Sequence, residues 1–415
     1  ACRHDSALWR SLLALLNYNA PEGEVSHRVA SLPARHGGSG LRRALRTRRG
    51  AHWAAWADAL PFIIERFPTL GARILEALEG AAVACDCLDA VRGCATRLTP
   101  EENGEPGEWV HGWQFFACDA LERDEAARLD LQLSPPWRAL LRSQRGKGAG
   151  DRLTAVPTGE LLSLEPALFL VVLLRRLFLP VPLGPRLCQG CGVELDPWGH
   201  HTLACPRTGW LKRRATGVEL AWVQVCAEAG ATAHHRPLLR NLAIPGVRDD
   251  DTRQLDVVAG GVSLCGAGTL VGDATLRSPL SGVGEPRFGA DVVDGATFAQ
   301  ARGDRTATYP ELLAAGCRVH FRVLACEIGG RFSPECLDLV SRLVEHKARQ
   351  QPHILQASFQ LILARRWWGI LSLAVQRAVA ANLVGASWAV GGVVPLPSFE
   401  ELLSLVEGTA PSRVR

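Results

Sequence analysis

The chain has 415 residues, of which 47% are hydrophobic and 21% are charged, so it can bury a sizeable core and global disorder is excluded. Its length favours two or three domains. The formal net charge of +4 is a mild basic excess, which permits a nucleic acid as partner but does not require one. The most apolar stretch, residues 167–183, contains two arginines and two prolines and is too short and too charged to cross a membrane.

Cysteine and methionine usage bear on the origin of the chain. Thirteen cysteines, an odd number, lie mostly singly along the sequence. That distribution fits a reduced intracellular protein better than a disulfide scaffold. Methionine is absent and the chain begins at Ala1, so we expect it to be part of a longer protein.

The first region, residues 1–184, is predicted to be helical. Segments with apolar residues at helical spacing lie at 8–16, 53–78, 112–144 and 160–178. A glycine-rich turn at 37–40 opens a basic helix, and residues 98–109 are expected to form a loop. Prolines at positions 180, 182 and 185 mark the end of the region.

The second region, residues 185–210, has the spacing of a zinc knuckle. Two cysteines form a C-x2-C pair, and histidines and a third cysteine follow shortly after. Thiolates on a tight turn can supply two corners of a tetrahedron, which a histidine and a cysteine from the next turn can close. Neighbouring glycines permit such turns. We expect a structural Zn²⁺ bound by Cys188, Cys191, His201 and Cys205, with His200 as the alternative to His201.

The third region, residues 211–334, alternates between helix and strand. The predicted elements are a helix at 212–230, strands at 232–242, 253–259 and 269–278, a helix at 296–315 bent at Pro310, and a strand at 319–328. This α-β-β-β-α-β order defines an α/β unit of about 120 residues. Residues 335–415 form the fourth region, a tail that is expected to be helical to about residue 385. The fold class is therefore mixed, with helical regions on either side of the α/β unit.

Two aspartates interrupt the apolar strands of the third region. Asp256 and Asp273 are each the lone carboxylate of a β-type run, where aspartate is uncommon. If their strands are neighbours, the two carboxylates form an oxygen-lined site suited to Mg²⁺, which can activate water and neutralise a phosphodiester. The alternative, which the spacing alone favours, is that both aspartates cap turns at strand ends.

Several motifs resemble the C-terminal part of non-LTR retrotransposon reverse transcriptases. Leu32-Pro33 followed by Gly37-Gly-Ser-Gly-Leu-Arg42 resembles the LP…GGxGLR segment that follows the polymerase domain in that family. The other similar motifs are, in chain order, the zinc knuckle, Arg253-x-x-Asp256, Asp273-Ala-Thr-x-x-Ser-Pro, the helix that carries Tyr309, and the strand that begins near Val323. The resemblance covers about residues 30–385 and does not include the polymerase palm.

The resemblance implies a thumb-like or connector region, a CCHC knuckle and a restriction-like endonuclease of the PD-(D/E)xK fold. It places the metal-binding acids at Asp256, on the second strand, and Asp273, on the third. The fold usually has lysine two residues after the second acid, where this chain has Thr275. In this retroelement group a lysine is instead expected four residues before the tyrosine, and this chain has Arg305 there, before Tyr309.

The implied function is Mg²⁺-dependent nicking of target DNA, with an upstream reverse transcriptase domain in the intact protein and a nuclear location. Arg305 would stabilise the transition state, since arginine keeps its charge but cannot give up a proton. Arg213, Arg214 and Arg236 would contact phosphates of DNA or RNA, although a solvated face explains these arginines equally well. The alternatives are a zinc-containing nucleic-acid-binding module that has lost its chemistry and a structural zinc scaffold.

Overall fold

The structure is a computed structural model, and it describes residues 1–79, 113–182, 187–261 and 268–385. The loop predicted at 98–109 and the end of the tail lie outside these residues. None of the helices in the described ranges combines the length and the apolar character that a membrane crossing requires.

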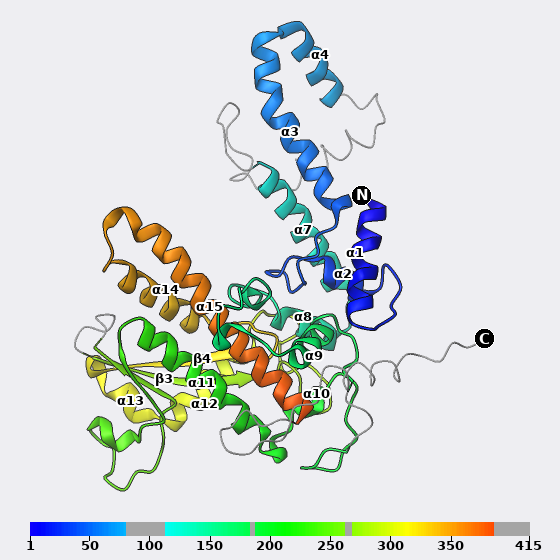
Figure 1. The fold of residues 1–415 in the computed structure, drawn as a ribbon. Helices are drawn as coiled ribbons and strands as arrows, with labels where there is room; N and C mark the ends of the chain where they lie inside the picture. The colour runs from blue at the N-terminus through cyan, green and yellow to red at the C-terminus, as the bar shows by residue number, and fades with distance from the viewer. Residues whose placement is uncertain (80–112, 183–186, 262–267, 386–415) are drawn as a thin grey trace.

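A four-stranded mixed sheet lies in the body of the molecule (Figure 1). Its strands, in spatial order, are β1 (Thr232–His235), β2 (Val257–Gly260), β3 (Thr269–Arg277) and β4 (Val319–Glu327). β1, β2 and β3 are antiparallel neighbours, whereas β3 and β4 run parallel. The parallel pair needs a crossover, which α12 (Thr297–Thr308) and α13 (Pro310–Ala314) supply. Together with the surrounding helices, the sheet confirms the predicted mixture of helix and strand.

Helix α11 (Trp210–Glu228) precedes the sheet, and the predicted bend at Pro310 separates α12 from α13. The strand predicted at 232–242 is wrong in length, since β1 ends at His235. The cause is the left-handed backbone of Arg236, with φ +54°, followed by Pro237, which has no N–H to donate to a neighbouring strand.

The second strand also differs from its prediction, because β2 begins at Val257 rather than at residue 253. Asp256 therefore lies immediately before the strand. Its carboxylate accepts a hydrogen bond from the N–H of Ala274 on β3, at 2.8 Å. The side chain of Asp256, and not a main-chain carbonyl, thus makes this contact between β3 and the segment that precedes β2.

The two faces of the sheet pack against different helices. Alternate residues of β3, such as Leu270 and Ala274, join Trp222 of α11 in the main hydrophobic cluster. Val271, on the opposite face, packs with Tyr309 and Leu312 of the crossover. Because side chains alternate along a strand, Asp273 shares the face of Val271, toward the crossover helices.

The remaining helices form a largely helical body and a projection (Figure 1). They are α1 (Cys2–Leu15), α2 (Val25–Ser31), α3 (Ala44–Arg66), α4 (Pro68–Glu79), α7 (Trp113–Gln132), α8 (Pro135–Ser143), α9 (Pro166–Arg176), α10 (His200–Ala204), α14 (Pro334–Ala348) and α15 (His353–Val384). The helical character predicted for the first region and for the tail to about residue 385 is confirmed within the described residues.

One hydrophobic cluster joins segments from all four predicted regions. Its members include Trp9, Leu203, Trp222, Leu324 and Trp367. The second half of α15 is buried almost throughout and runs through this cluster, while much of its first half is exposed. The tail is therefore part of the core, and the predicted domain boundaries remain predictions.

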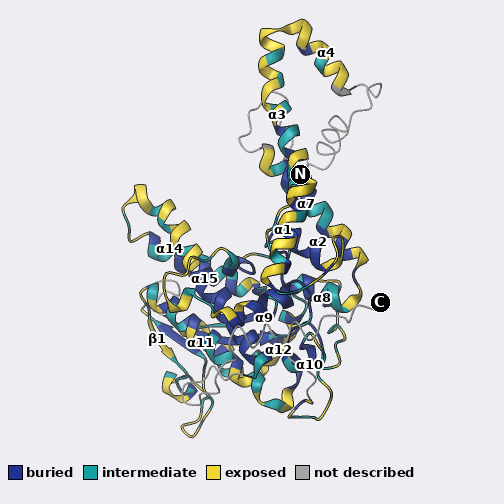
Figure 2. Cartoon of the chain, turned by 45° about the vertical axis from the view of Figure 1, so that its right-hand side comes forward, coloured by how far each residue is buried: buried dark blue, intermediate teal, exposed yellow. Residues whose placement is uncertain are grey.

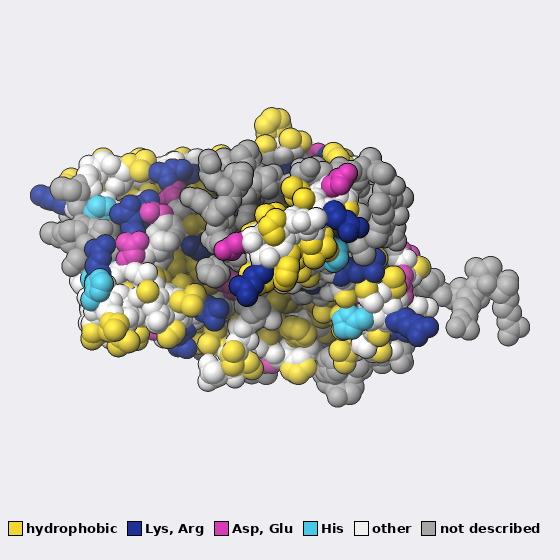
Figure 3. Space-filling model, turned by 90° about the horizontal axis from the view of Figure 1, so that it is seen from above, with side chains coloured by type: hydrophobic (Ala, Val, Ile, Leu, Met, Phe, Trp, Pro, Cys, Tyr) yellow, Lys and Arg dark blue, Asp and Glu magenta, His cyan; other side chains and the backbone are white. Residues whose placement is uncertain are grey.

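The projection contains α3 and α4, which extend away from the body, and α7 packs beside α3 (Figures 1 and 2). Figure 2 shows exposed residues along most of its length, whereas the buried residues gather around α9 and α11. Hydrophobic side chains are exposed near its end, where Phe62, Phe67 and Leu70 are between 49% and 59% accessible. Viewed from above, hydrophobic side chains gather near the centre of the view (Figure 3).

Candidate metal centre and candidate active site

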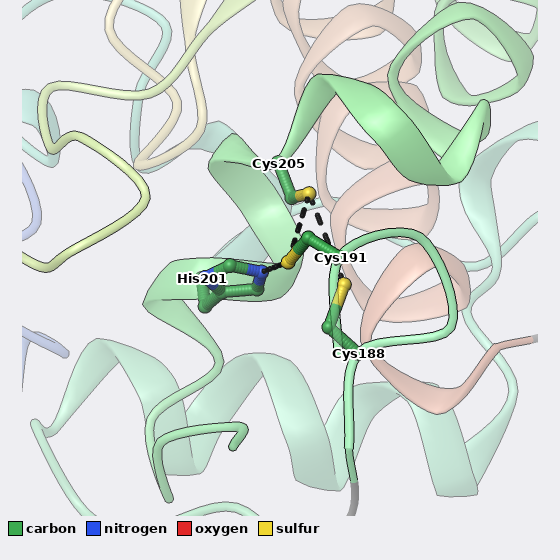
Figure 4. Close-up of side chains that lie close together, drawn as sticks. All are labelled: Cys188, Cys191, His201 and Cys205. Atoms are coloured by element: carbon green, nitrogen blue, oxygen red, sulfur yellow. Dashed lines mark hydrogen bonds between the residues drawn. The ribbon is translucent and has the colours of Figure 1, made fainter. Parts of the chain in front are cut away.

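The three cysteines and the histidine predicted as zinc ligands come together in the structure (Figure 4). Their ligand atoms all lie within 4.8 Å of one another. The Sγ atom of Cys205 is 3.8 Å from that of Cys188 and 3.9 Å from that of Cys191, and the Nε2 atom of His201 is 3.1 Å from Cys191 Sγ. Zinc–sulfur bonds of about 2.3 Å place the corners of a tetrahedron about 3.8 Å apart, so the donor set and its spacing fit Zn²⁺.

His201, rather than His200, belongs to this cluster. The Nδ1 atom of His201 lies 2.8 Å from the carbonyl oxygen of Gly282, so that a proton on Nδ1 leaves Nε2 free as a ligand. His200 instead stacks on Trp198, with the rings 6.0 Å apart and 11° from parallel. The carboxylate of Asp196 accepts hydrogen bonds from the backbone N–H groups of both histidines and thereby fixes the start of α10.

Glycines permit the turns of the knuckle, as the sequence predicted. Gly192 and Gly199 have φ of +74° and +71°, values that favour glycine. Gly190 is required for a different reason, since a Cβ atom there would lie 2.6 Å from the backbone of Arg207. These glycines thus allow the chain to turn sharply enough to bring the four ligands together.

The environment of the thiols differs within the cluster. Burial raises the pKa of Cys188, but hydrogen bonds from the N–H groups of Gly190 and Cys191, together with its side-chain partners, lower it to about 6. Burial raises the pKa of Cys205, and the neighbouring cysteine thiols raise it further. A bound cation would stabilise the thiolate form that zinc ligation requires.

A second group of side chains surrounds the predicted acid pair. In the β2–β3 register Val257 faces Gly272, so Asp256 is one residue beyond the last pair and faces Asp273. Asp273 is buried, at 2% exposure, and Asp256 is half-buried. Burial raises the pKa of Asp256 to about 7, with further contributions from Asp273 and Glu219. The pKa of Asp273 is also raised, mainly by burial, although Arg305 opposes the shift.

Arg305 and Tyr309 reach this pair from the crossover. The Nε atom of Arg305 on α12 lies 2.8 Å from the Oδ1 atom of Asp273. Tyr309 donates a hydrogen bond from its hydroxyl to the carbonyl oxygen of Gln254, and burial beside the carboxylates raises its pKa to about 12. Arg305 is therefore placed beside the acids, as the prediction required of a residue in this site.

Glu219 is an acidic neighbour that sequence reasoning missed. Glu219 lies on α11 and is 2% exposed. Its carboxylate accepts a hydrogen bond from Nε of Arg236, at 2.8 Å, and lies 2.8 Å from Nε2 of His235. A signal was present in the sequence, because Glu219 is an acid beside Val218 and close to Trp222 on a helix with apolar spacing.

A cleft of about 710 Å³ opens at this site. Asp256 and Thr275 line it directly, and Asp273 is buried beside them. The charged residues that line it are Lys212, Arg214, Glu219, Arg236, Asp256, Arg277, Arg287, Asp304 and Arg305. Six of these are basic and three are acidic, so the lining favours an anionic ligand such as a phosphate.

The three arginines predicted to contact phosphate have different surroundings. Arg213 is exposed and lies over the ring of Trp210, 5.5 Å from its centroid. Arg236 lines the cleft but is paired with Glu219. Arg214 also lines the cleft, and its contact with phosphate stays a prediction. This residue is 6% exposed and donates hydrogen bonds to the carbonyl oxygens of Leu203, at 2.7 Å, and Leu276, at 2.9 Å.

Asp256 and Asp273 are the side chains of this group that could hold a hard cation. Within the described part of the protein, the Oδ1 atom of Asp273 is buried and makes no hydrogen bond, despite its short distance from Arg305. Such an orphaned carboxylate oxygen can bind a hard cation. The described residues nevertheless bring three or more metal-binding side chains together at the Cys/His cluster and not here, so the remaining ligands would have to be water or substrate oxygens.

No model of a known protein family matches the chain, and no curated protein matches it either. The interpretation of the site therefore rests on its residues and their geometry.

Proposed function

We propose that this chain is the C-terminal part of a retroelement protein, in which a zinc knuckle adjoins a Mg²⁺-dependent endonuclease domain that hydrolyses a phosphodiester bond of DNA. The observation that carries the proposal is the position of Asp256 opposite Asp273 at a cleft whose charged lining residues are mainly basic. Carboxylates suited to a metal and arginines suited to phosphate are the two components that such chemistry needs.

The arrangement of the strands supports this proposal. The elements follow in the order α11, β1, β2, β3, α12, β4, with three antiparallel strands and a parallel fourth. This is the α-β-β-β-α-β order that the restriction-like fold implies. We infer that Asp256 and Asp273 occupy the positions of the two metal-binding acids of that fold.

Each side chain has a role in the proposed reaction. Asp256 and Asp273 would hold Mg²⁺, which when bound supplies an activated water and neutralises charge on the phosphate. Arg305 would lie beside the scissile phosphate and stabilise its developing negative charge. Lys212 and Arg287, which line the same cleft, would hold the neighbouring backbone phosphates.

The zinc knuckle would support the cleft rather than take part in the reaction. Leu203 and Ala204 of α10 line the cleft, and α10 begins with the proposed ligand His201 and its neighbour His200. Arg214 joins this helix to β3 through its two hydrogen bonds to main-chain carbonyls. A zinc ion would therefore hold one wall of the cleft in place.

Nicking of supercoiled plasmid DNA in MgCl₂ tests the proposal. We expect the purified chain to convert supercoiled plasmid to open circles, and Asp273→Asn to abolish the conversion. Asp250→Asn is the matched control, since Asp250 lies on an exposed loop and pairs with Arg248. Equal activity of both variants, or cleavage that persists in excess EDTA, would overturn the assignment of Asp273.

A second candidate function is nucleic-acid binding without cleavage. The observation that favours it is the guanidinium of Arg305 beside Asp273, a carboxylate that would hold the metal ion, together with Thr275 at the usual lysine position. Salt-dependent DNA binding with no nicking, in the wild type and in Arg305→Lys, would support this candidate against the first.

A further inference from the structure

A small pocket lies apart from both the zinc cluster and the acidic cleft. It lies between α8, α9, α15 and the turn that follows β4, and its volume is about 20 Å³. The polar side chains that line it are Ser143, Gln144, Arg152, Arg175, Arg176 and Gln376. None of the described residues that line it is acidic.

The cavity gathers positive charge in the core of the protein. Arg152 is 7% exposed and Arg176 is 2% exposed, and both line the cavity with the partly buried Arg175. Within the described residues, none of the three forms an ion pair with a carboxylate. Burial lowers the pKa of Arg176 well below its usual value, and the charge of Arg152 lowers it further. Buried cations in such proximity are unfavourable unless an anion compensates them.

Each arginine also has a donor left over. Arg176 donates from Nε to the carbonyl oxygen of Gly38 and from Nη2 to that of Ala34, but its Nη1 has no acceptor among the described residues. Arg175 donates from Nη1 to the carbonyl oxygen of Trp198, and its buried Nη2 likewise lacks a partner.

Arg152 follows the same pattern. One of its guanidinium nitrogens donates to the carbonyl oxygen of Ala149, whereas its buried Nε has no acceptor in the described part of the chain. Gln144 contributes an unpartnered amide oxygen to the same cavity. A rotation of that amide by 180° exchanges oxygen for nitrogen and turns a further donor toward the cavity.

We propose that this cavity binds a single monovalent anion of the size of chloride, held by Arg152, Arg175 and Arg176. The unpartnered N–H groups supply donors, the guanidinium charges supply the attraction, and the acid-free lining removes the repulsion that an anion would otherwise meet. The site is structural and separate from the proposed nuclease cleft, and it joins α8 and α9 to the turn after β4.

The size of the cavity selects the ligand. A water molecule needs at least about 10–15 Å³ of such volume, so 20 Å³ accommodates one water or one ion of slightly larger radius. A phosphate or sulfate, with four oxygen atoms around a central atom, is larger than this volume. Asp151 and Asp196 compensate part of the charge of Arg152 and Arg175. Water could accept the unpartnered hydrogens but, unlike an anion, would add no further negative charge beside the guanidinium groups.

Thermal unfolding in different sodium salts at equal ionic strength tests this inference. Chloride and bromide are expected to raise the Tm progressively with concentration, whereas gluconate, which is too large for the cavity, is expected to leave it unchanged. The Arg176→Gln variant should lose the difference between chloride and gluconate. Arg248→Gln should retain the difference, because Arg248 is 81% exposed on the surface.

A second measurement needs no variant to fold. Crystals of the wild-type protein grown in sodium bromide should show an anomalous bromine peak between the guanidinium groups of Arg152 and Arg176. Such a peak, with the chloride-specific rise in Tm, supports the site. Equal Tm values in chloride and gluconate, or a water without anomalous signal in the cavity, would overturn it.

Discussion

The Nε atom of Arg305 lies 2.8 Å from the Oδ1 atom of Asp273, yet the two atoms do not form a hydrogen bond. Both atoms are buried, and the direction of the Arg305 N–H excludes a bond to the carboxylate oxygen. The pair is thus held mainly by charge. This geometry leaves two possible partners for Asp273, the guanidinium that now lies beside it and a metal ion that would share it with Asp256.

Removal of the zinc ligands should remove the metal. The Cys188→Ser, Cys191→Ser double variant is expected to contain no zinc, whereas the wild-type chain should contain one ion, because two of the four ligand atoms are lost. Metal analysis of the purified proteins measures the difference. The Tm of the double variant should fall as well, since binding energy at a structural zinc site contributes to folding.

Two adjacent histidines provide a matched comparison for the same site. His201→Asn should weaken zinc retention against a chelator, because His201 Nε2 faces Cys191 Sγ. His200→Asn should retain zinc, since His200 packs against Trp137 and Trp198 instead. The assignment of His201 fails if the two variants lose zinc equally fast.

Arg214 is expected to act through stability rather than through phosphate contacts. Arg214→Gln removes donors from the carbonyl oxygens of Leu203 and Leu276, and each buried acceptor left unpaired costs about 1–3 kcal/mol of folding free energy. Urea unfolding measures the loss. Arg213→Gln is the control, because Arg213 is exposed, and its free energy of unfolding should match that of the wild type.

The different positions of these two arginines show what the sequence could and could not predict. The run Lys212-Arg213-Arg214 has the composition of a basic surface. On a helix, however, Arg214 shares a face with Val218 and Trp222, which are buried. Helical periodicity could therefore have separated Arg214 from its neighbours, although it could not have identified the main-chain carbonyls that accept its hydrogen bonds.

The local sequence pattern was sufficient to predict features that lie within one short segment of the chain. The apolar run at 269–278 predicted β3, and the ligand spacing predicted the cysteine and histidine cluster. It was insufficient where the backbone of one residue ends an element, as at Arg236, whose positive φ ends β1 early. Helical periodicity indicated the burial of Glu219, but it could not identify the contact of Glu219 with His235 of β1, which lies 16 residues further along the chain.

Stability should depend on pH through Asp256. Burial and the nearby Asp273 raise the pKa of Asp256 in the folded protein from 3.8 to about 7. Between these values the unfolded chain releases the proton while the folded protein retains it, so ionisation of Asp256 lowers the stability of the fold as the pH rises from about 4 to 7. Below this window the effect of Asp256 disappears, and above it the loss is complete.

Asp256→Asn tests this dependence, because asparagine keeps an oxygen that can accept the hydrogen bond of Ala274. Without Mg²⁺, the Tm of the variant should exceed that of the wild type at pH 8, and the difference should shrink toward pH 4. Glu327, whose pKa burial also raises to about 7, is present in both proteins, so its contribution cancels in the comparison. A difference in Tm that stays constant from pH 4 to pH 8 would contradict the raised pKa.

The final prediction concerns the competition between Arg305 and a metal ion for the carboxylate of Asp273. Lysine at position 305 keeps the positive charge on a shorter side chain with three rotatable donors. It is also the residue expected at this position in the family that the sequence resembles. We therefore expect Arg305→Lys to raise the rate of plasmid nicking in MgCl₂, by weakening the competition for the Oδ1 atom of Asp273. The rate of open-circle formation at several Mg²⁺ concentrations measures the effect.

Arg302→Lys is the matched control, since Arg302 lies on the same helix but pairs with Glu335. It should nick at the wild-type rate. If competition for Asp273 is the cause, the gain from Arg305→Lys should be largest at low Mg²⁺ and should diminish as the metal saturates the site. An equal gain at every Mg²⁺ concentration would instead assign the effect to the transition state, and no gain would mean that Arg305 does not restrict the acid pair.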